Sequence, residues 1–245
     1  MREQFAIILG SGFGDLVETQ PYECADSEFG QPSSALFTRE FSGTDVRLLL
    51  RHGEKHDIPP HAINYRANIA ALNSAGVSAI IALNTVGVVS RIAAGGQLAV
   101  PQQLIDYTWG REHTFATGGA AGVRHIEFTE PFTELLRIGL LRASVSAGVE
   151  CVDGGVYAVT QGPRLETAAE VDRLERDGVD YVGMTAMPEA ALAAELDIDY
   201  AMIALVVNRA AGRGDGSIHA DVEVNSSTAK SAAMRVLDAF FRASR

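Results

Sequence analysis

The chain contains few cysteines and no run of basic residues, and each shortage excludes a class of protein. Cys24 and Cys151 are the only cysteines among 245 residues, too few for a disulfide scaffold and not spaced as zinc ligands. Acidic residues outnumber basic ones by 31 to 20, which gives a formal net charge of -11. Because no stripe of Lys and Arg is present to face phosphate groups, the sequence does not predict a protein that binds a nucleic acid polymer.

Long hydrophobic runs are missing as well. No segment approaches the roughly 20 apolar residues of a membrane span. The first apolar run, residues 5–9, is too short for a signal peptide, and no small-residue cleavage site follows it. We therefore expect a cytoplasmic protein that does not associate with membranes. Hydrophobic residues still make up 47% of the chain, and the lack of an internal repeat or low-complexity linker predicts one domain over residues 1–245.

Short apolar runs alternate with helical stretches along the chain. The apolar, β-branched runs predict strands at residues 5–9, 46–50, 77–83, 98–100, 104–107, 156–160, 179–182 and 200–207. Helical spacing predicts helices at residues 61–75, 167–176, 189–196 and 227–243. This alternation predicts a single α/β domain with a central mixed β-sheet flanked by helices. Residues 212–216, GRGDG, are expected to form a mobile loop.

Polar residues and glycines follow most of the predicted strands. They lie at residues 10–14, 51–53, 84–87, 161–166, 184–185 and 208. Ligands of α/β sheets usually bind outside the strand ends, and an arginine, hydroxyl groups and glycine-exposed backbone N–H groups can together hold a phosphate. Glu166 and Asn208 are suited to bind a heterocycle, although Glu166 can equally be a helix-start charge and Asn208 a turn residue. Their joint placement after successive strands favours a binding site.

Two of these features have simpler explanations when each is taken alone. Glycine turns after strands are common, and residues 10–14 lack the full G-x-G-x-x-G of a dinucleotide site. His52 and His56 with Glu54 have the spacing of some zinc ligands. However, Gly53 and the prolines at 59–60 disfavour a helix there, and the metalloprotease motif needs Glu directly after its first His. We therefore predict no metal site.

The segments after the strands resemble a known family. The blocks GSG, RHGxxH followed by PP and NYRANI, NTVG, TQGPRLET, VGMTAMPEAALA and ALVVNRAAG occur in this order from about residue 6 to residue 211. Together they are similar to the trimeric purine nucleoside phosphorylase and methylthioadenosine phosphorylase family, and within it to the bacterial branch that acts on S-methyl-5'-thioinosine. One departure is NTVGVV in place of a more usual NAAGG, which leaves fewer glycines to approach phosphate.

The resemblance implies a homotrimer that catalyses phosphorolysis, with inorganic phosphate as a co-substrate and no metal or organic cofactor. The implied phosphate ligands are Ser11, Arg51, His52, Thr185 and, through a backbone N–H, Thr85. The implied substrate contacts are Met184 under the ribose, Leu165 against the purine, Glu166 and Asn208 at the base, and His125 of a neighbouring subunit over the 5' pocket. Arg51 would supply a permanent charge and a guanidinium fork, His52 a donor, and Asn208 stabilisation of the leaving purine, so these are the predicted catalytic residues.

Base preference follows from the hydrogen-bonding groups at the two base-binding residues. The amide of Asn208 can accept from N7–H and donate to O6, and the carboxylate of Glu166 can accept from N1–H. Adenine lacks N1–H and carries an amine in place of O6, so it would leave these groups mismatched. The pair therefore predicts a preference for 6-oxopurines.

The 5' pocket leaves the choice of sugar open. Ile218, Ala220 and Val222 would form an apolar wall suited to a methylthio group, whereas His219 could bond a 5'-hydroxyl. We expect S-methyl-5'-thioinosine as the substrate. A general inosine/guanosine phosphorylase and a methylthioadenosine phosphorylase are the alternatives within the class. A non-catalytic purine-binding sensor is the alternative from another class, but such a protein needs no separate phosphate site.

Overall fold

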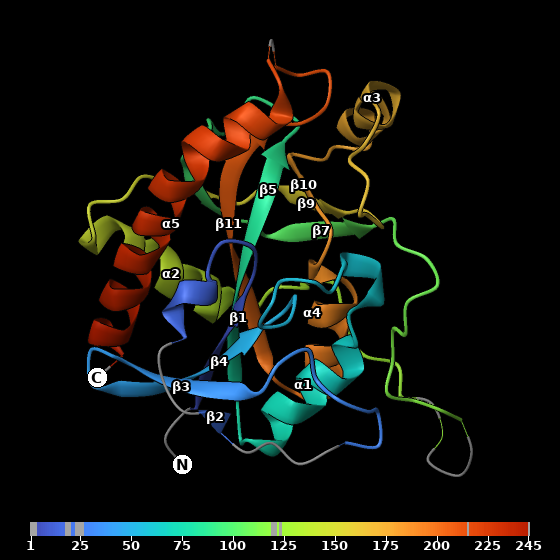
Figure 1. Ribbon diagram of the computed structural model, residues 1–245, viewed down its shortest axis with the longest axis vertical. Coiled ribbons are helices and arrows are strands. Elements are labelled where there is room, and N and C mark those ends of the chain that lie inside the picture. Colours follow the sequence, from blue (N-terminus) through green and yellow to red (C-terminus); the bar gives the residue numbers. More distant parts are fainter. Residues whose placement is uncertain are drawn as a thin grey trace.

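A mixed β-sheet forms the centre of the protein, and helices cover both of its faces (Figure 1). The computed structural model describes residues 4–17, 21–22, 27–118, 122, 124–214 and 216–244, so Cys24 lies outside the described residues. The strand order is β2-β3-β4-β1-β5-β10-β9-β7, and β11 pairs with β5 and β6 while β8 pairs with β6. The predicted α/β domain with a central mixed sheet is confirmed.

The parallel centre of the sheet brings several strand ends to the same region. It consists of β4 (Thr44–Leu50), β1 (Phe5–Leu9), β5 (Ala79–Val88) and β11 (Asp199–Arg209). At one edge β3 (Leu36–Phe41) and β2 (Pro21–Tyr22) add antiparallel strands. On the other side β10 (Tyr181–Gly183) pairs antiparallel with β5, followed by β9 (Val156–Val159) and β7 (Gln103–Asp106). The short strands β6 (Leu98–Val100) and β8 (Cys151–Asp153) lie beyond β11.

The helices pack in two pairs. On one face α1 (Tyr65–Ser74) contacts α4 (Ala186–Glu195), and on the other α2 (Glu134–Ser146) contacts α5 (Ile218–Ala243). The remaining α-helix, α3 (Ala168–Arg176), begins with a capping box in which Thr167 and Glu170 bond each other's backbone N–H groups. Two short 3₁₀ turns, η1 (Gly14–Leu16) and η2 (Pro60–Ala62), follow β1 and precede α1.

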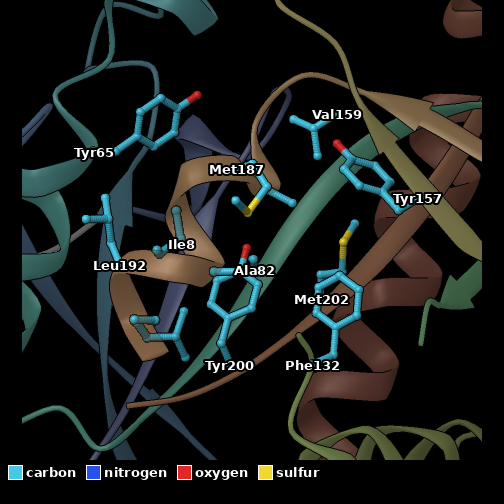
Figure 2. Close-up of a cluster of buried hydrophobic side chains, with 14 of the residues drawn as sticks. Ile8, Tyr65, Ala82, Phe132, Tyr157, Val159, Met187, Leu192, Tyr200 and Met202 are labelled. Carbon is cyan, nitrogen blue, oxygen red and sulfur yellow. The ribbon is translucent and has the colours of Figure 1, made fainter. Parts of the chain in front are cut away.

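Both faces of the sheet are buried, which explains why its strands are almost continuously apolar. Along β1, Ala6 and Ile8 belong to one hydrophobic core, and Phe5, Ile7 and Leu9 belong to the other. Figure 2 shows the first core, in which the β1 and β5 side chains face those of α4. Alternate side chains of a strand point to opposite faces, so a fully apolar run is what a doubly covered strand requires.

Most predicted elements occur within a few residues of their expected positions, and the exceptions have physical causes. The strands β2, β3 and β8 lie at or next to the sheet edges and were not predicted. The helix α2 was not predicted either, although its buried Leu136, Leu140 and Ala143 have helical spacing. The helix α5 begins at Ile218 rather than at residue 227. Residues 218–226 contain β-branched and polar residues of modest helix propensity, but Ile218 and Val222 are four residues apart and share one helix face.

The segment at 212–216 is held by ion pairs in its described part. Arg213 contacts Asp172 at 2.8 Å and Glu175 at 2.7 Å, and both partners lie on α3. Asp215 lies outside the described residues, and the mobility expected of this loop stays a prediction. No helix in the described part of the chain combines the length and apolar character that crossing a bilayer requires.

Candidate active site

The sheet leaves a gap beside the second half of β5. β1 pairs with β5 from Ala79 to Ala82, and β10 pairs with it only at Gly87 and Val88. Between these stretches, residues 83–86 pair with β11 alone among the described strands. Residues 84–86 therefore face a cavity of about 720 Å³ instead of another strand. The divergence of β1 and β10 from β5 is what creates the site.

Most of the predicted site residues line this cavity. They are Ser11, Arg51, His52, Thr85, Leu165, Glu166, Met184, Thr185, Asn208 and Ile218. They come from the ends of β1, β4, β5, β9, β10 and β11 and from the start of α5. The structure thus gathers segments that are far apart in sequence, as the strand-end argument requires. Two predicted residues, Ala220 and His125, do not line it.

The prediction for Ala220 is wrong because its segment is helical. Ile218, Val222, Ser226 and Lys230 follow one another at four-residue spacing in α5, and all of them line the cavity. Ala220 lies two residues from Ile218, on another side of the helix, and is exposed. Of the three residues expected to form an apolar wall, Ile218 and Val222 line the cavity and Ala220 does not.

His125 is exposed and lies away from the cavity of its own chain. The resemblance places this residue over the site of a neighbouring subunit, so its position within one chain does not test that role. It stays a prediction.

Arg51 is fully buried, and its guanidinium fork is already occupied. Its Nε and Nη2 each donate to a carboxylate oxygen of Glu189 at 2.8 Å. Nη1 donates to the carbonyl oxygen of Leu83 at 3.1 Å, and Nη2 also reaches Oδ1 of Asn84 at 3.5 Å. The expected two-pronged hold on phosphate is therefore not available. One N–H of Nη1 has no acceptor among the described residues and is the donor that Arg51 can offer to a ligand.

The charge of Arg51 persists in this environment. Burial favours the neutral form, but the adjacent Glu189 carboxylate outweighs it and raises the pKa of Arg51 above its ordinary value. Close packing also fixes the group in place. A Cβ atom at Gly10 would lie 2.4 Å from the Leu83 carbonyl oxygen and 3.2 Å from Nη1 of Arg51. Glycine after β1 is therefore required for the close approach of backbone to arginine, rather than being an ordinary turn residue.

His52 differs from its predicted role as a phosphate donor. Its Nδ1 lies 2.9 Å from the carbonyl oxygen of Ile58, so Nδ1 carries the proton in the neutral ring and Nε2 is an acceptor. Burial lowers the pKa of His52 to about 4, and the neighbouring Arg51 and His56 add to this effect. At neutral pH, Nε2 of His52 is suited to accept the P–OH proton of hydrogen phosphate.

His52 also makes the stability of the fold depend on pH. Its pKa is about 4 in the folded protein, against an ordinary value of 6.5, so between these values the unfolded chain binds more protons. The free energy of unfolding should therefore fall as pH is lowered from about 6.5 to about 4. The variant His52→Asn should show a shallower fall, by at most about 1.4 kcal/mol per pH unit. Urea unfolding across this range measures it, and equal slopes in variant and parent would contradict a buried neutral His52.

Hydroxyl groups complete this end of the cavity. The Nδ2 of Asn84 donates to Oγ1 of Thr185 at 2.8 Å, which leaves the Thr185 hydroxyl proton free to point toward a ligand. Oγ of Ser11 lies 3.4 Å from Nε2 of His56. Lys230 approaches from α5 and is paired with Asp15. The cluster therefore offers several neutral hydrogen-bonding groups around the single free donor of Arg51.

The two base-binding candidates lie on other segments of the same cavity. Oε1 of Glu166 accepts from the Thr160 hydroxyl at 2.6 Å, so Oε2 is available to a ligand. Nδ2 of Asn208 donates one of its protons to the carbonyl of Arg209 at 2.7 Å. Asn208 therefore keeps one N–H and its amide oxygen for a heterocycle, which are the two groups that the base-recognition hypothesis needs.

Gly87 makes room for Asn208. The two residues are paired across β5 and β11 next to a register shift, and a Cβ at Gly87 would lie 3.0 Å from Nδ2 of Asn208. We expect Gly87→Ala to push the amide by a few tenths of an ångström and to lower kcat/KM for the substrate about three- to tenfold. Gly14→Ala is the control, because nothing lies within 4 Å of a Cβ there. Equal kcat/KM values in Gly87→Ala and the parent would contradict this role.

Arg111 is an organising residue that sequence reasoning missed. It is 8% exposed and has no carboxylate partner among the described residues. It donates to the backbone carbonyls of Met184, Met187 and Gln161 at 2.8, 2.6 and 2.9 Å, and to the Tyr65 hydroxyl at 3.2 Å. A buried cation thus ties the residue expected under the ribose to the loop that carries Glu166, the candidate for base binding. Its position in GREHT carries no periodic signal that would have identified it.

Glu189 was also not assigned a role, although the sequence contains a signal for it. It is the only charged residue in MPEAALAA and is fully buried in α4. An isolated acid in an otherwise apolar helix predicts a buried cationic partner, but the sequence does not say which. In the described residues, no group of three or more His, Cys, Asp or Glu side chains is arranged to hold a metal ion.

Comparison with known proteins places the chain in a family. The phosphorylase superfamily model matches residues 4–242. The chain belongs to the phosphorylase superfamily, which confirms the family resemblance found in the sequence.

Relatives with curated names cover most of the chain. The probable S-methyl-5'-thioinosine phosphorylase of Pseudomonas syringae pv. tomato is 48% identical over 87% of this chain and 88% of its own length. A protein of Xylella fastidiosa with the same name is 50% identical over 86% of each chain. The 6-oxopurine nucleoside phosphorylase of Pyrococcus furiosus is 39% identical over 89% of this chain and 84% of its own.

Solved structures with the same fold are of enzymes named for a different substrate, methylthioadenosine. Methylthioadenosine phosphorylase from Schistosoma mansoni, in complex with tubercidin, matches with a TM-score of 0.88 and 30% identity, covering 98% of this chain and 91% of that one. A methylthioadenosine phosphorylase from an antarctic soil metagenomic library matches with a TM-score of 0.89 and 30% identity, covering 98% and 85%.

Proposed function

We propose that the protein is a purine nucleoside phosphorylase that cleaves 6-oxopurine (methylthio)ribonucleosides. The favoured reaction converts S-methyl-5'-thioinosine and phosphate into hypoxanthine and 5-methylthioribose 1-phosphate. One observation carries the proposal: a single cavity joins a cluster of phosphate-type donors around Arg51 to the free hydrogen-bonding groups of Glu166 and Asn208. The names of the sequence relatives support it.

The chemistry needs no metal or organic cofactor, because phosphate itself is the nucleophile. Phosphate attacks C1' of the ribose while the glycosidic bond breaks through an oxocarbenium-like state, and the purine leaves with the bonding electrons. The donors of Arg51 and Thr185, with the acceptor nitrogen of His52, would hold hydrogen phosphate under C1'. Asn208 would stabilise the negative charge that develops on the purine, accepting from N7–H and donating to O6. Glu166 would accept from N1–H.

The 5' end of the cavity supports a methylthio substituent. Val222 packs against the core cluster that contains Phe13, Leu205 and Val207, and all four side chains line the cavity. The Ser226 hydroxyl donates to the carbonyl of Val222 within α5, so it cannot also donate to a 5'-hydroxyl. Covering a methylthio group with an apolar wall costs less free energy than covering a hydroxyl, because the hydroxyl would lose its hydrogen bonds to water.

A general inosine/guanosine phosphorylase is the second candidate, and one residue favours it. His219 lines the same cavity and can bond a 5'-hydroxyl. It is largely exposed, so solvent can satisfy it when a methylthio group is bound.

A substrate panel tests base and sugar preference together. With phosphate saturating, S-methyl-5'-thioinosine should be cleaved with at least a tenfold higher kcat/KM than S-methyl-5'-thioadenosine, because two mismatched hydrogen bonds are worth roughly 2–6 kcal/mol. Inosine should be the weaker of the two 6-oxopurine substrates. Asn208→Asp should lower turnover of the thioinosine and raise relative use of the thioadenosine. Equal use of both bases by the unmodified protein would refute the roles of Asn208 and Glu166.

The assembly that we propose is a homotrimer with shared sites. The supporting observation is that His125 is exposed and does not line the cavity of its own chain. In a trimer it would be available to cover the cavity of a neighbouring subunit. Light scattering after size exclusion should give about three chains per particle, and a fully active monomer at assay concentration would contradict the proposal.

A further inference from the structure

Glu189 is the centre of a buried network that reaches the proposed phosphate site without entering the cavity. Its carboxylate accepts two bonds from Arg51 and a third, at 2.8 Å, from the hydroxyl of Tyr200. Glu189 and Arg51 are both 0% exposed, and Tyr200 is 2% exposed. Figure 2 shows Tyr200 beneath α4, in the core that also holds Met187. Glu189 is not among the residues that line the cavity.

The cations around the proposed phosphate site are already paired. Arg51 is neutralised by Glu189, and Lys230 by Asp15. His52 is neutral at physiological pH, because its pKa is about 4. Among the described residues that line the cavity, no remaining cation compensates the charge of a phosphate dianion, and Glu166 adds a negative charge.

We propose that Glu189 is a positioning residue that fixes Arg51 and, by neutralising it, keeps phosphate affinity low enough for the sugar 1-phosphate product to leave. The inference rests on the proposed function, because it assumes that phosphate binds beside Arg51. It makes Glu189 a determinant of phosphate affinity that never touches phosphate.

Two opposing effects decide what removal of the Glu189 charge does. Glutamine at this position holds Arg51 less firmly, which weakens its contact with phosphate. It also leaves a buried guanidinium without the counter-ion that it has among the described residues, so bound phosphate would compensate its charge. Arg51 keeps its contacts with Leu83 and Asn84, so the second effect should dominate. At an effective dielectric constant of about 20, the loss of one like charge on the far side of Arg51 from phosphate tightens binding by about tenfold or more.

The test compares two substitutions at Glu189 that act in opposite directions. Glu189→Gln should melt at a lower temperature without phosphate, bind inorganic phosphate about tenfold more tightly, and bind ribose 1-phosphate more tightly. Its kcat should fall, because the product leaves more slowly. Glu189→Asp keeps the charge but shortens the reach to Arg51, so it should bind phosphate more weakly than the parent. Isothermal titration with inorganic phosphate measures both dissociation constants.

The direction of the change in phosphate affinity separates this role from a structural one. If Glu189 only supports the fold, both variants should bind phosphate equally or more weakly than the parent, and that result overturns the inference. If Glu189→Gln fails to fold, Glu189→Asp still tests the positioning part of the proposal, since unchanged or tighter phosphate binding in that variant contradicts it. The double variant Arg51→Met/Glu189→Gln removes both charges. It should regain much of the thermal stability lost in Glu189→Gln, and phosphate should no longer raise its melting temperature. A melting temperature that still rises with phosphate would contradict the proposal.

The parent protein distinguishes failure of the inference from failure of the proposed function. If the parent neither binds phosphate nor catalyses phosphorolysis, the proposed function is wrong and the inference falls with it. If the parent does both and Glu189→Gln does not bind phosphate more tightly, only the inference is wrong.

Discussion

Replacing Arg51 with alanine should raise the KM for phosphate at least about thirtyfold and lower the free energy of unfolding by about 3–5 kcal/mol. The first effect is the loss of a charge-assisted donor worth about 2 kcal/mol or more in a closed site. The second arises because Glu189 would remain fully buried with Tyr200 as its one donor among the described residues. The uncompensated negative charge of Glu189 would also repel phosphate, so the two effects reinforce each other.

Two measurements separate these effects. Phosphate titration of the initial rate gives the KM, and urea unfolding gives the stability. Arg91→Ala is a suitable control, because Arg91 is exposed and lies away from the cavity; its unfolding free energy should change by no more than about 0.5 kcal/mol. An unchanged phosphate KM in the Arg51 variant would contradict the placement of the phosphate site.

Arg111→Met should lower the free energy of unfolding by about 3 kcal/mol or more and raise the KM for the nucleoside more than the KM for phosphate. Methionine keeps the apolar stem but removes every donor, which leaves the carbonyls of Met184, Met187 and Gln161 without that partner. These carbonyls belong to the segments expected under the ribose and beside the base. None of the side chains proposed to hold phosphate is bonded to Arg111 among the described contacts.

The conservative variant tests whether the contacts of Arg111 matter individually. Arg111→Lys retains a charge but has three donors in another geometry, so it should recover stability in part and the nucleoside KM only partly. Steady-state kinetics on both substrates gives the comparison. Equal increases in the two KM values of Arg111→Met would indicate a general loss of structure and would contradict a specific role at the nucleoside end.

The sequence was sufficient for the fold class and for the region of the site. Strands covered on both faces must be apolar throughout, so runs such as FAIIL and YAMIALVV could be recognised without an alignment. Ligands bind at strand ends in such sheets, so the residues after the strands could be collected before their positions in space were known. Nine of the predicted site residues come from these segments and line one cavity.

The interactions that define the site were not predictable from local pattern. The Arg51–Glu189 pair joins residues 138 positions apart, and no pattern in either segment identifies the other as its partner. The start of α5 has weak helix formers, so the predicted helix began only at residue 227 and Ala220 was placed on the cavity wall, whereas the observed helix turns it outward. The acceptor role of His52 depends on the carbonyl of Ile58, which a loop brings to its Nδ1. Each of these features depends on tertiary packing.

The dependence of hypoxanthine release on phosphate is the most direct test of the proposed phosphorolysis. Purified protein would be incubated with S-methyl-5'-thioinosine over a series of phosphate concentrations, and hypoxanthine and 5-methylthioribose 1-phosphate would be quantified together. We expect equal amounts of the two products, a rate that saturates with phosphate, and no hypoxanthine when phosphate is omitted. Release of hypoxanthine at the same rate without phosphate, or no release at any phosphate concentration, would contradict the proposed function.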